Sequence, residues 1–170
     1  GIVLLCLMVL TIGFTASCSK MDVGYLRTAG ASFTPDSINA FHNIDPTSDR
    51  AVNNLPFVST RIQGVAGTNP VNFYFQSVTV SEGADAAAFN KAVQEGLVTV
   101  SGGTINLFPK AVATLPNGRY TVNLRVTNEG YSRELKGLFT FIVKDKAEEV
   151  LEEGTTEENP SSEDSPVDNS

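Results

Sequence analysis

The sequence predicts an all-β protein, a Greek-key β-sandwich of about seven strands with a short helical insert. Three observations predict this fold. Apolar and polar residues alternate along 119–127, as they do in a half-buried strand. Two further β-rich runs flank Gly102 and Gly103, which suit a tight hairpin turn. The expected strands do not alternate with helices and show no fixed repeat, which argues against βαβ folds, solenoids and propellers.

Residues 115–143 form the best-defined part of the pattern, a hairpin with its turn at 128–130 and a second strand at 138–143. One face of its first strand is apolar and predicts core, namely Tyr120, Val122, Leu124 and Val126. The other face is polar and predicts solvent contact, namely Thr121, Asn123, Arg125 and Thr127. Tyr120 resembles the tyrosine corner of immunoglobulin-like sandwiches, in which a Tyr near the start of the penultimate strand bonds back to the preceding chain. The resemblance implies an immunoglobulin-like Greek-key domain, expected over residues 31–145.

The remaining elements of this domain follow in order along the chain. Residues 31–38 predict an edge strand, because Pro35 interrupts it, and the polar segment 42–56 predicts a loop. In residues 71–80 the apolar parity changes at Gln76, which indicates either a bulge or a strand buried on both faces. Asp85 is a suitable N-cap for a short helix ending near Val93, expected to close one end of the sandwich. Residues 109–114 then bridge to the hairpin at 115–143.

The charge of the chain is concentrated at its C-terminus. The sequence has a formal net charge of −7, and residues 144–170 hold ten acids and two lysines, which leaves +1 for residues 1–143. The body of the protein is therefore nearly neutral and gives no basic patch for nucleic acid. Residues 146–170 are expected to be an acidic disordered tail, because they hold too little apolar surface to offset the entropy of ordering.

The first residues have the character of an export signal. Residues 1–17 are apolar and end in Thr15-Ala16-Ser17, directly before Cys18. Small residues before a cysteine resemble the lipobox of bacterial lipoproteins, which implies that Cys18 is the lipid attachment site and holds the protein to a membrane. The alternative is an ordinary secreted protein that keeps a free thiol. Cys6 lies in the segment to be removed, so no intramolecular disulfide is expected.

Residues 18–30 are expected to be an N-terminal tether. The Lys20 and Asp22 that follow Cys18 resemble the export signal of surface lipoproteins of Bacteroidota. Together with the segments 21–26 and 56–70, the chain resembles an uncharacterised Bacteroidota outer-membrane lipoprotein family that accompanies glycan-uptake systems of the starch-utilisation type. This implies an outer-membrane lipoprotein facing the cell exterior. The family brings no established activity and no site.

The sequence offers few residues for chemistry, so we expect neither an enzyme nor a cofactor or metal site. His42 is the only histidine and is expected in a surface turn, which excludes a His-based triad or a two-His metal site within one chain. Several weaker patterns fit turns better than sites. They are the calcium candidates Asp36, Asp45 and Asp49, the carboxylate pairs Glu82 with Asp85 and Glu129 with Glu134, and the glycine-containing run Gly64, Val65, Ala66 and Gly67.

Two functions remain open. The first is a non-catalytic binding or accessory module at the cell surface, whose partner is a polysaccharide. The chain has no Trp, so sugar stacking would fall to Tyr25, Tyr74 or Tyr131, of which Tyr131 is expected to be the most exposed ligand contact. The second is a structural subunit that assembles with neighbouring outer-membrane proteins, as in fimbriae or transporter complexes. A concave groove lined by Tyr, Asn and Arg would favour ligand binding, whereas an uncovered edge strand or apolar patch would favour assembly.

Overall fold

A computed structural model of the chain describes residues 24–146. The expected signal segment 1–17, the lipid-attachment residue Cys18 and nearly all of the acidic tail lie outside these residues. The strands are β1 (Leu26–Arg27), β2 (Ser37–Phe41), β3 (Phe57–Val58), β4 (Ala66–Gly67), β5 (Asn72–Ser81), β6 (Val98–Ser101), β7 (Thr104–Leu107), β8 (Gly118–Asn128) and β9 (Tyr131–Lys144). The helices are α2 (Asp49–Val52), α3 (Ala86–Gln94) and α4 (Pro109–Val112).

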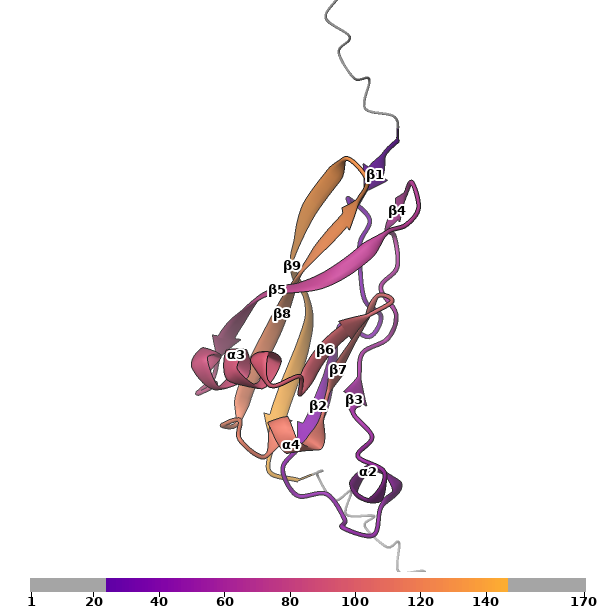
Figure 1. Ribbon diagram of the computed structural model, residues 1–170. Coiled ribbons are helices and arrows are strands. Elements are labelled where there is room, and N and C mark those ends of the chain that lie inside the picture. Colours follow the sequence, from indigo (N-terminus) through magenta and orange to yellow (C-terminus); the bar gives the residue numbers. More distant parts are fainter. Residues whose placement is uncertain (1–23, 147–170) are drawn as a thin grey trace, which may run out of the picture.

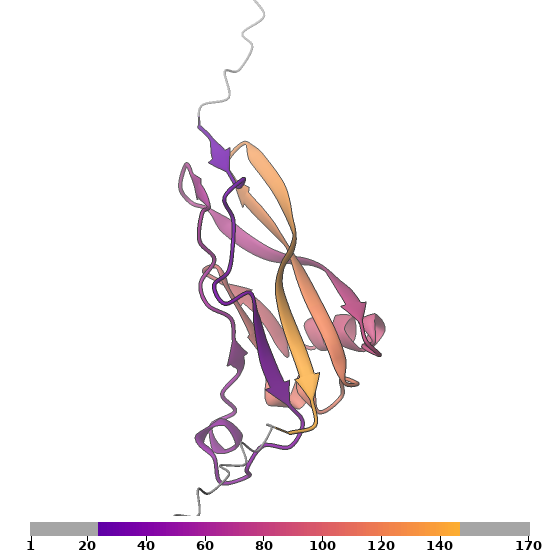
Figure 2. The ribbon, with the colours of Figure 1, turned by 180° about the vertical axis from the view of Figure 1, so that it is seen from behind.

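The strands form three sheets, so the prediction of an all-β fold is confirmed. A four-stranded sheet has the order β2-β9-β8-β5, a three-stranded sheet has the order β3-β7-β6, and β1 pairs with β4. The pairs are antiparallel except β2 with β9, which is parallel. Figures 1 and 2 show an elongated molecule. β1 and β4 lie at one end, together with the first described residues, and α2 lies near the other end, together with the last described residues.

The hydrophobic core is built on the apolar face of β8. Tyr120, Val122, Leu124 and Val126 are at most 1% exposed, which confirms the face predicted for this strand. Phe89 of α3 stacks on Tyr120 with 5.4 Å between ring centroids. The helix therefore covers one flank of the core, as its predicted N-cap and apolar positions indicate, and Asp85 caps the backbone amides of Ala87 and Ala88.

Two irregularities interrupt the large sheet near its centre. The pairing of β5 with β8 shifts register between Phe75 and Ser77, which confirms the first of the two predicted alternatives, a bulge. The second, a strand buried on both faces, is wrong, because no residue of β5 is buried. The pairing of β8 with β9 shifts between Val122 and Leu124. Bulges increase the local right-handed twist of a sheet. The half of the β8–β9 hairpin between the bulges and the hairpin turn is accordingly rotated relative to the other half, as Figure 2 shows. The hairpin turn lies beside β1.

Several elements differ from the sequence-based expectation. The first edge strand is β2, which lies later than the expected 31–38, because the chain gains a regular ladder with β9 only after Pro35. The strand β9 starts at Tyr131, well before residue 138. Short helices occur at α2 and α4 in segments expected to be loop or bridge. Finally, β1 lies within the expected tether, because Leu26 is buried and pairs with Gly67.

Candidate functional site

A groove of about 340 Å³ lies near the end of the molecule that carries β1 and β4. A volume of this size lies at the lower end of the range for small-ligand sites. Aromatic, polar and apolar residues surround it, from β4, β5, the loops on either side of β4 and the residue that precedes β1. The lining residues are Tyr25, Arg61, Ile62, Val65, Ala66, Gly67, Asn69, Val71 and Phe73.

One wall of the groove is built by backbone pairing around Tyr25. The Tyr25 amide donates to the Thr68 hydroxyl at 3.0 Å, and the Thr68 amide donates to the Tyr25 carbonyl at 3.0 Å. The side-chain amide of Asn128, at the end of β8, donates to the carbonyl oxygens of both residues at 2.7 and 3.1 Å. These bonds fix the backbone of Tyr25 while its side chain stays 48% exposed. The ring is thus held at the groove without being committed to the core.

Another part of the lining, Arg61 and Ile62, is positioned by the tip of the β6–β7 hairpin. The Ile62 amide donates to the Gly103 carbonyl at 2.8 Å, and Ile62 is buried. A Cβ at Gly103 would lie 2.8 Å from the Ile62 side chain, so the tip packs closely against this segment. The two glycines of the turn, with φ of 57° and 83°, confirm the predicted Gly-Gly hairpin. Arg61 precedes the fixed Ile62 and is exposed at the groove.

The polar groups of the groove are available to a ligand. Within residues 24–146, the side chains of Arg61 and Asn69 and the hydroxyl of Tyr25 make no hydrogen bond or ion pair. A second cation is close by, because the Arg27 guanidinium lies 5.4 Å from the centroid of the Tyr25 ring. None of the described lining residues is acidic. The groove therefore combines an aromatic face, an amide and an uncompensated positive charge.

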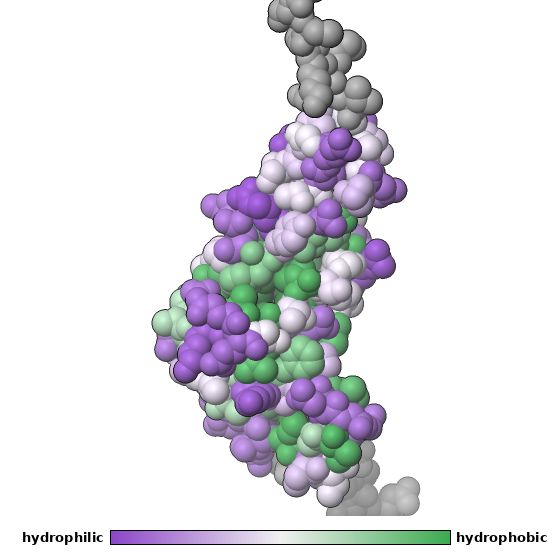
Figure 3. Space-filling view, in the orientation of Figure 1, coloured by the Kyte–Doolittle hydropathy of each residue, from purple (hydrophilic) through white to green (hydrophobic). Residues whose placement is uncertain are grey.

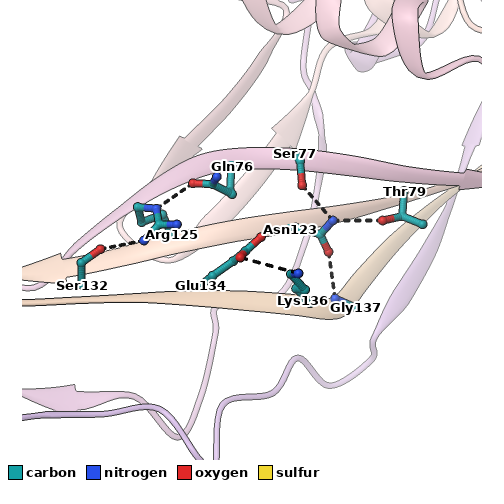
Figure 4. A network of polar contacts seen from close by, with 9 residues as sticks. All are labelled: Gln76, Ser77, Thr79, Asn123, Arg125, Ser132, Glu134, Lys136 and Gly137. Atoms are coloured by element: carbon teal, nitrogen blue, oxygen red, sulfur yellow. Dashed lines mark hydrogen bonds and ion pairs between the residues drawn. The ribbon is translucent and has the colours of Figure 1, made fainter.

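The outer face of the large sheet carries a second cluster of polar side chains, but these bond to one another (Figure 4). The Arg125 guanidinium donates to Gln76 at 2.7 Å and to Ser132 at 2.8 Å. Lys136 lies 3.7 Å from Glu134. The cluster ties β5, β8 and β9 together across the sheet, so each of these side chains has a structural partner. The side chains of Arg61 and Asn69 at the groove have none among residues 24–146.

The expectation that Tyr131 is the most exposed tyrosine is wrong. Tyr25 and Tyr74 are 48% and 52% exposed, whereas Tyr131 is only partly exposed and packs against the core. Its hydroxyl donates to the Gly24 carbonyl at 3.1 Å, because the twisted hairpin tip lies beside the start of the described chain. Tyr74 lies on β5 opposite Arg125, away from the groove lining. Tyr25 is therefore the tyrosine that the structure brings to the groove.

Several other residues singled out in the sequence have structural partners. His42 is partly buried, and its ring contacts the Leu115 carbonyl and the Asp145 carboxylate, joining the ends of β2 and β9. Asp45 accepts bonds from the amide and hydroxyl of Thr47, and these bonds lower the pKa of its carboxyl. Ala66 and Gly67 belong to β4, where a turn was expected. Among the described residues, no three His, Cys, Asp or Glu side chains gather as a metal site would require.

None of the helices within residues 24–146 has the length and apolar character needed to cross a bilayer. No family model, curated protein or solved structure matches the chain significantly.

Proposed function

We propose that this chain is a cell-surface binding or accessory module, tethered to the outer membrane through a lipid on Cys18, with a glycan as ligand and no catalytic activity. The observation that carries the proposal is the groove with its exposed Tyr25 and unpaired Arg61 and Asn69. Open grooves with an aromatic platform and a few free polar groups suit sugars, which offer hydroxyls to bond and apolar ring faces to stack.

We also propose that the domain is an immunoglobulin-like Greek-key sandwich. The order of the strands supports this. If β3, β5, β6, β7, β8 and β9 are lettered B to G, the sheets read G-F-C and B-E-D, the orders of constant-type immunoglobulin domains. The Tyr120 hydroxyl also donates to the Pro116 carbonyl, four residues upstream, as a tyrosine corner does. The parallel pairing of β2 with β9 departs from that seven-strand arrangement.

The position of the groove is compatible with a tethered module. Tyr25 is seven residues from Cys18 in the sequence, a distance that a fully extended chain spans in at most about 25 Å. A ligand in the groove would therefore lie close to the anchored surface. This placement suits a subunit that hands glycan to, or takes it from, a neighbouring membrane protein.

The proposal is tested with a soluble form from Ser19 to Ser170, which retains every described strand and helix. It is applied to a glycan array together with Tyr25→Ala and the control Tyr131→Phe. We expect saturable binding to one glycan class, weakened about tenfold or more in Tyr25→Ala, as loss of an aromatic anchor does. Tyr131→Phe keeps the ring and should bind as the parent does. Binding to no glycan would overturn the proposal.

A second candidate is a structural subunit, and the edge of the large sheet favours it. The ten-residue strand β5 has β8 on one side and no strand on the other within the described residues. None of its residues is fully buried, and Phe73, Phe75, Val78 and Val80 are only partly covered. Figure 3 shows apolar surface across the middle of the molecule, in the region where Figure 1 draws β5. An open edge of this kind can accept a strand from another chain.

The two candidates predict different effects of one substitution. Thr79 is an exposed residue of β5, and Thr79→Pro removes a backbone donor from that strand together with the hydroxyl that accepts from Asn123. Thr79→Val, which loses only the hydroxyl, is the control. Recovery of an outer-membrane partner in pull-down, lost in Thr79→Pro but kept in Tyr25→Ala, would favour assembly. Glycan binding kept in Thr79→Pro and lost in Tyr25→Ala would favour the ligand-binding module. Far-UV circular dichroism of Thr79→Pro checks that the sheet is retained.

A further inference from the structure

We infer that the groove is selective for acidic saccharides, with a carboxylate or sulfate group bound by Arg61 and a sugar ring lying on Tyr25. This inference rests on the proposed glycan-binding function and specifies its ligand class. It starts from the charge of the groove: Arg61 has no ion-pair partner among residues 24–146, and no acid is among the described lining residues.

Arg61 differs in its contacts from two other arginines of the described chain, Arg125 and Arg50. The Arg125 guanidinium is bonded to Gln76 and Ser132, and that of Arg50 donates to the Pro56 carbonyl at 2.6 Å and covers the Phe57 ring. These arginines have local structural roles. Arg61 has none in the described chain, yet its backbone position is fixed by the bond between Ile62 and Gly103. A guanidinium that is carried on a fixed stretch of backbone and has all its donors free is suited to a planar carboxylate or to a sulfate.

The surroundings of Arg61 select a sugar over a simple anion. Tyr25 is 48% exposed and offers part of its ring, and Asn69 offers both a donor and an acceptor for hydroxyl groups. Arg27 beside the Tyr25 ring adds a second positive charge near the same groove. The apolar lining residues Ile62, Val71 and Phe73 suit the C–H face of a pyranose. An isolated phosphate ion would use the charge and leave the rest of the groove empty.

The test compares polygalacturonate and chondroitin sulfate with neutral amylose and dextran on the soluble Ser19–Ser170 protein, by isothermal titration. We expect binding of an acidic polymer, weakened about tenfold to a hundredfold in Arg61→Gln, the usual effect of losing one charge-assisted bond. Arg61→Lys should restore part of the affinity, since it keeps the charge but not the fork. Raising NaCl from about 50 to 500 mM should also weaken binding.

Arg133→Gln is the matched control, because Arg133 is an exposed arginine on β9, over Tyr131 and outside the groove lining. It removes the same charge and should leave affinity unchanged. Equal weakening by both arginine variants would mean nonspecific charge attraction and would overturn the inference. Binding of neutral glycans alone would also overturn it while leaving the proposed function intact. Binding of an acidic peptide such as polyglutamate with equal affinity would assign the groove to a protein partner, and binding of no polymer would reject both proposals.

Discussion

The hydroxyl of Tyr120 joins two parts of the fold, donating to the Pro116 carbonyl at 2.8 Å and accepting from the Asp85 amide at 3.2 Å. The first bond fixes the turn into β8, and the second fixes the residue that caps α3. Burial raises the pKa of the Tyr120 hydroxyl, so it remains a protonated donor at neutral pH. One side chain thus couples the central strand to the helix that covers the core.

Tyr120→Phe should lower the free energy of unfolding by about 1–3 kcal/mol, because it leaves the Pro116 carbonyl and the Asp85 amide without this partner. The measurement is the urea midpoint of unfolding. Tyr131→Phe is the control, since it removes a single bond to Gly24 at the less buried end of the hairpin and should cost less. Equal stability of Tyr120→Phe and the parent would show that neither bond contributes.

Asn123→Ala should also destabilise the fold by about 1–3 kcal/mol. The side chain of Asn123 is 4% exposed and lies between the two bulges (Figure 4). Its amide donates to Ser77 at 3.1 Å and to Thr79 at 3.0 Å, while its oxygen accepts from the Gly137 amide at 2.9 Å. The variant removes all three bonds and leaves the Gly137 amide unpaired.

Hydrogen exchange at the Gly137 amide measures the local effect of Asn123→Ala. Its hydrogen exchange should become faster in Asn123→Ala than the global loss of stability explains, because the bulge opens locally. Thr121→Ala is the matched control on the same strand face, since its hydroxyl bonds only to the Thr140 hydroxyl. Unchanged exchange at Gly137 in Asn123→Ala would contradict the role given to this side chain.

Sequence patterns predicted the parts of the fold that depend on local chemistry. The strand β8, the bulge in β5, the Asp85 cap and the Gly-Gly hairpin each follow from residue types a few positions apart. The parallel pairing of β2 with β9 and the β1–β4 pair join residues far apart in sequence. Strands of two residues carry no period that could be read from sequence. The alternation of apolar and polar residues placed Asn123 on the solvated face. Alternation does not indicate the two bulges that bury this side chain.

The groove could not be predicted because its residues are joined only by the fold. Tyr25 was placed in a tether, and nothing in the sequence pairs it with the segment around Arg61. Tyr131 was preferred because turn residues are usually exposed, but the twist of the hairpin brings it against Gly24. The run from Gly64 to Gly67 was the one available signal, since a glycine-containing stretch between polar residues indicates a close backbone approach.

Gly64→Ala should destabilise the fold more than Gly130→Ala, and the two form a matched pair. Both glycines have positive φ, 75° and 96°, so each substitution introduces backbone strain. A Cβ at Gly64 would also collide with the Gly30 carbonyl, whereas one at Gly130 meets nothing. We expect Gly130→Ala to cost about 1–3 kcal/mol, from strain alone. Gly64→Ala should lower the free energy of unfolding by more than this, and it should weaken ligand binding because this loop borders the groove. Equal thermal midpoints in the two variants would contradict the close approach of Gly64 to Gly30.

Asp145→Asn should change how stability depends on pH. The bond to His42, then that to Asn117, holds the pKa of the Asp145 carboxyl below its usual value of 3.8. Because the folded pKa is depressed, the carboxylate contributes stability above about pH 4, and the contribution is lost as pH falls through the lowered folded pKa. The thermal midpoint of the parent should therefore be higher than that of Asp145→Asn at neutral pH, and the two midpoints should converge near pH 2.

The effect is expected to be small and reduced by salt, since the carboxylate is exposed. A constant difference across this pH range would mean that Asp145 acts through its hydrogen bonds in either protonation state, and that the junction of β2 with β9 does not depend on its charge.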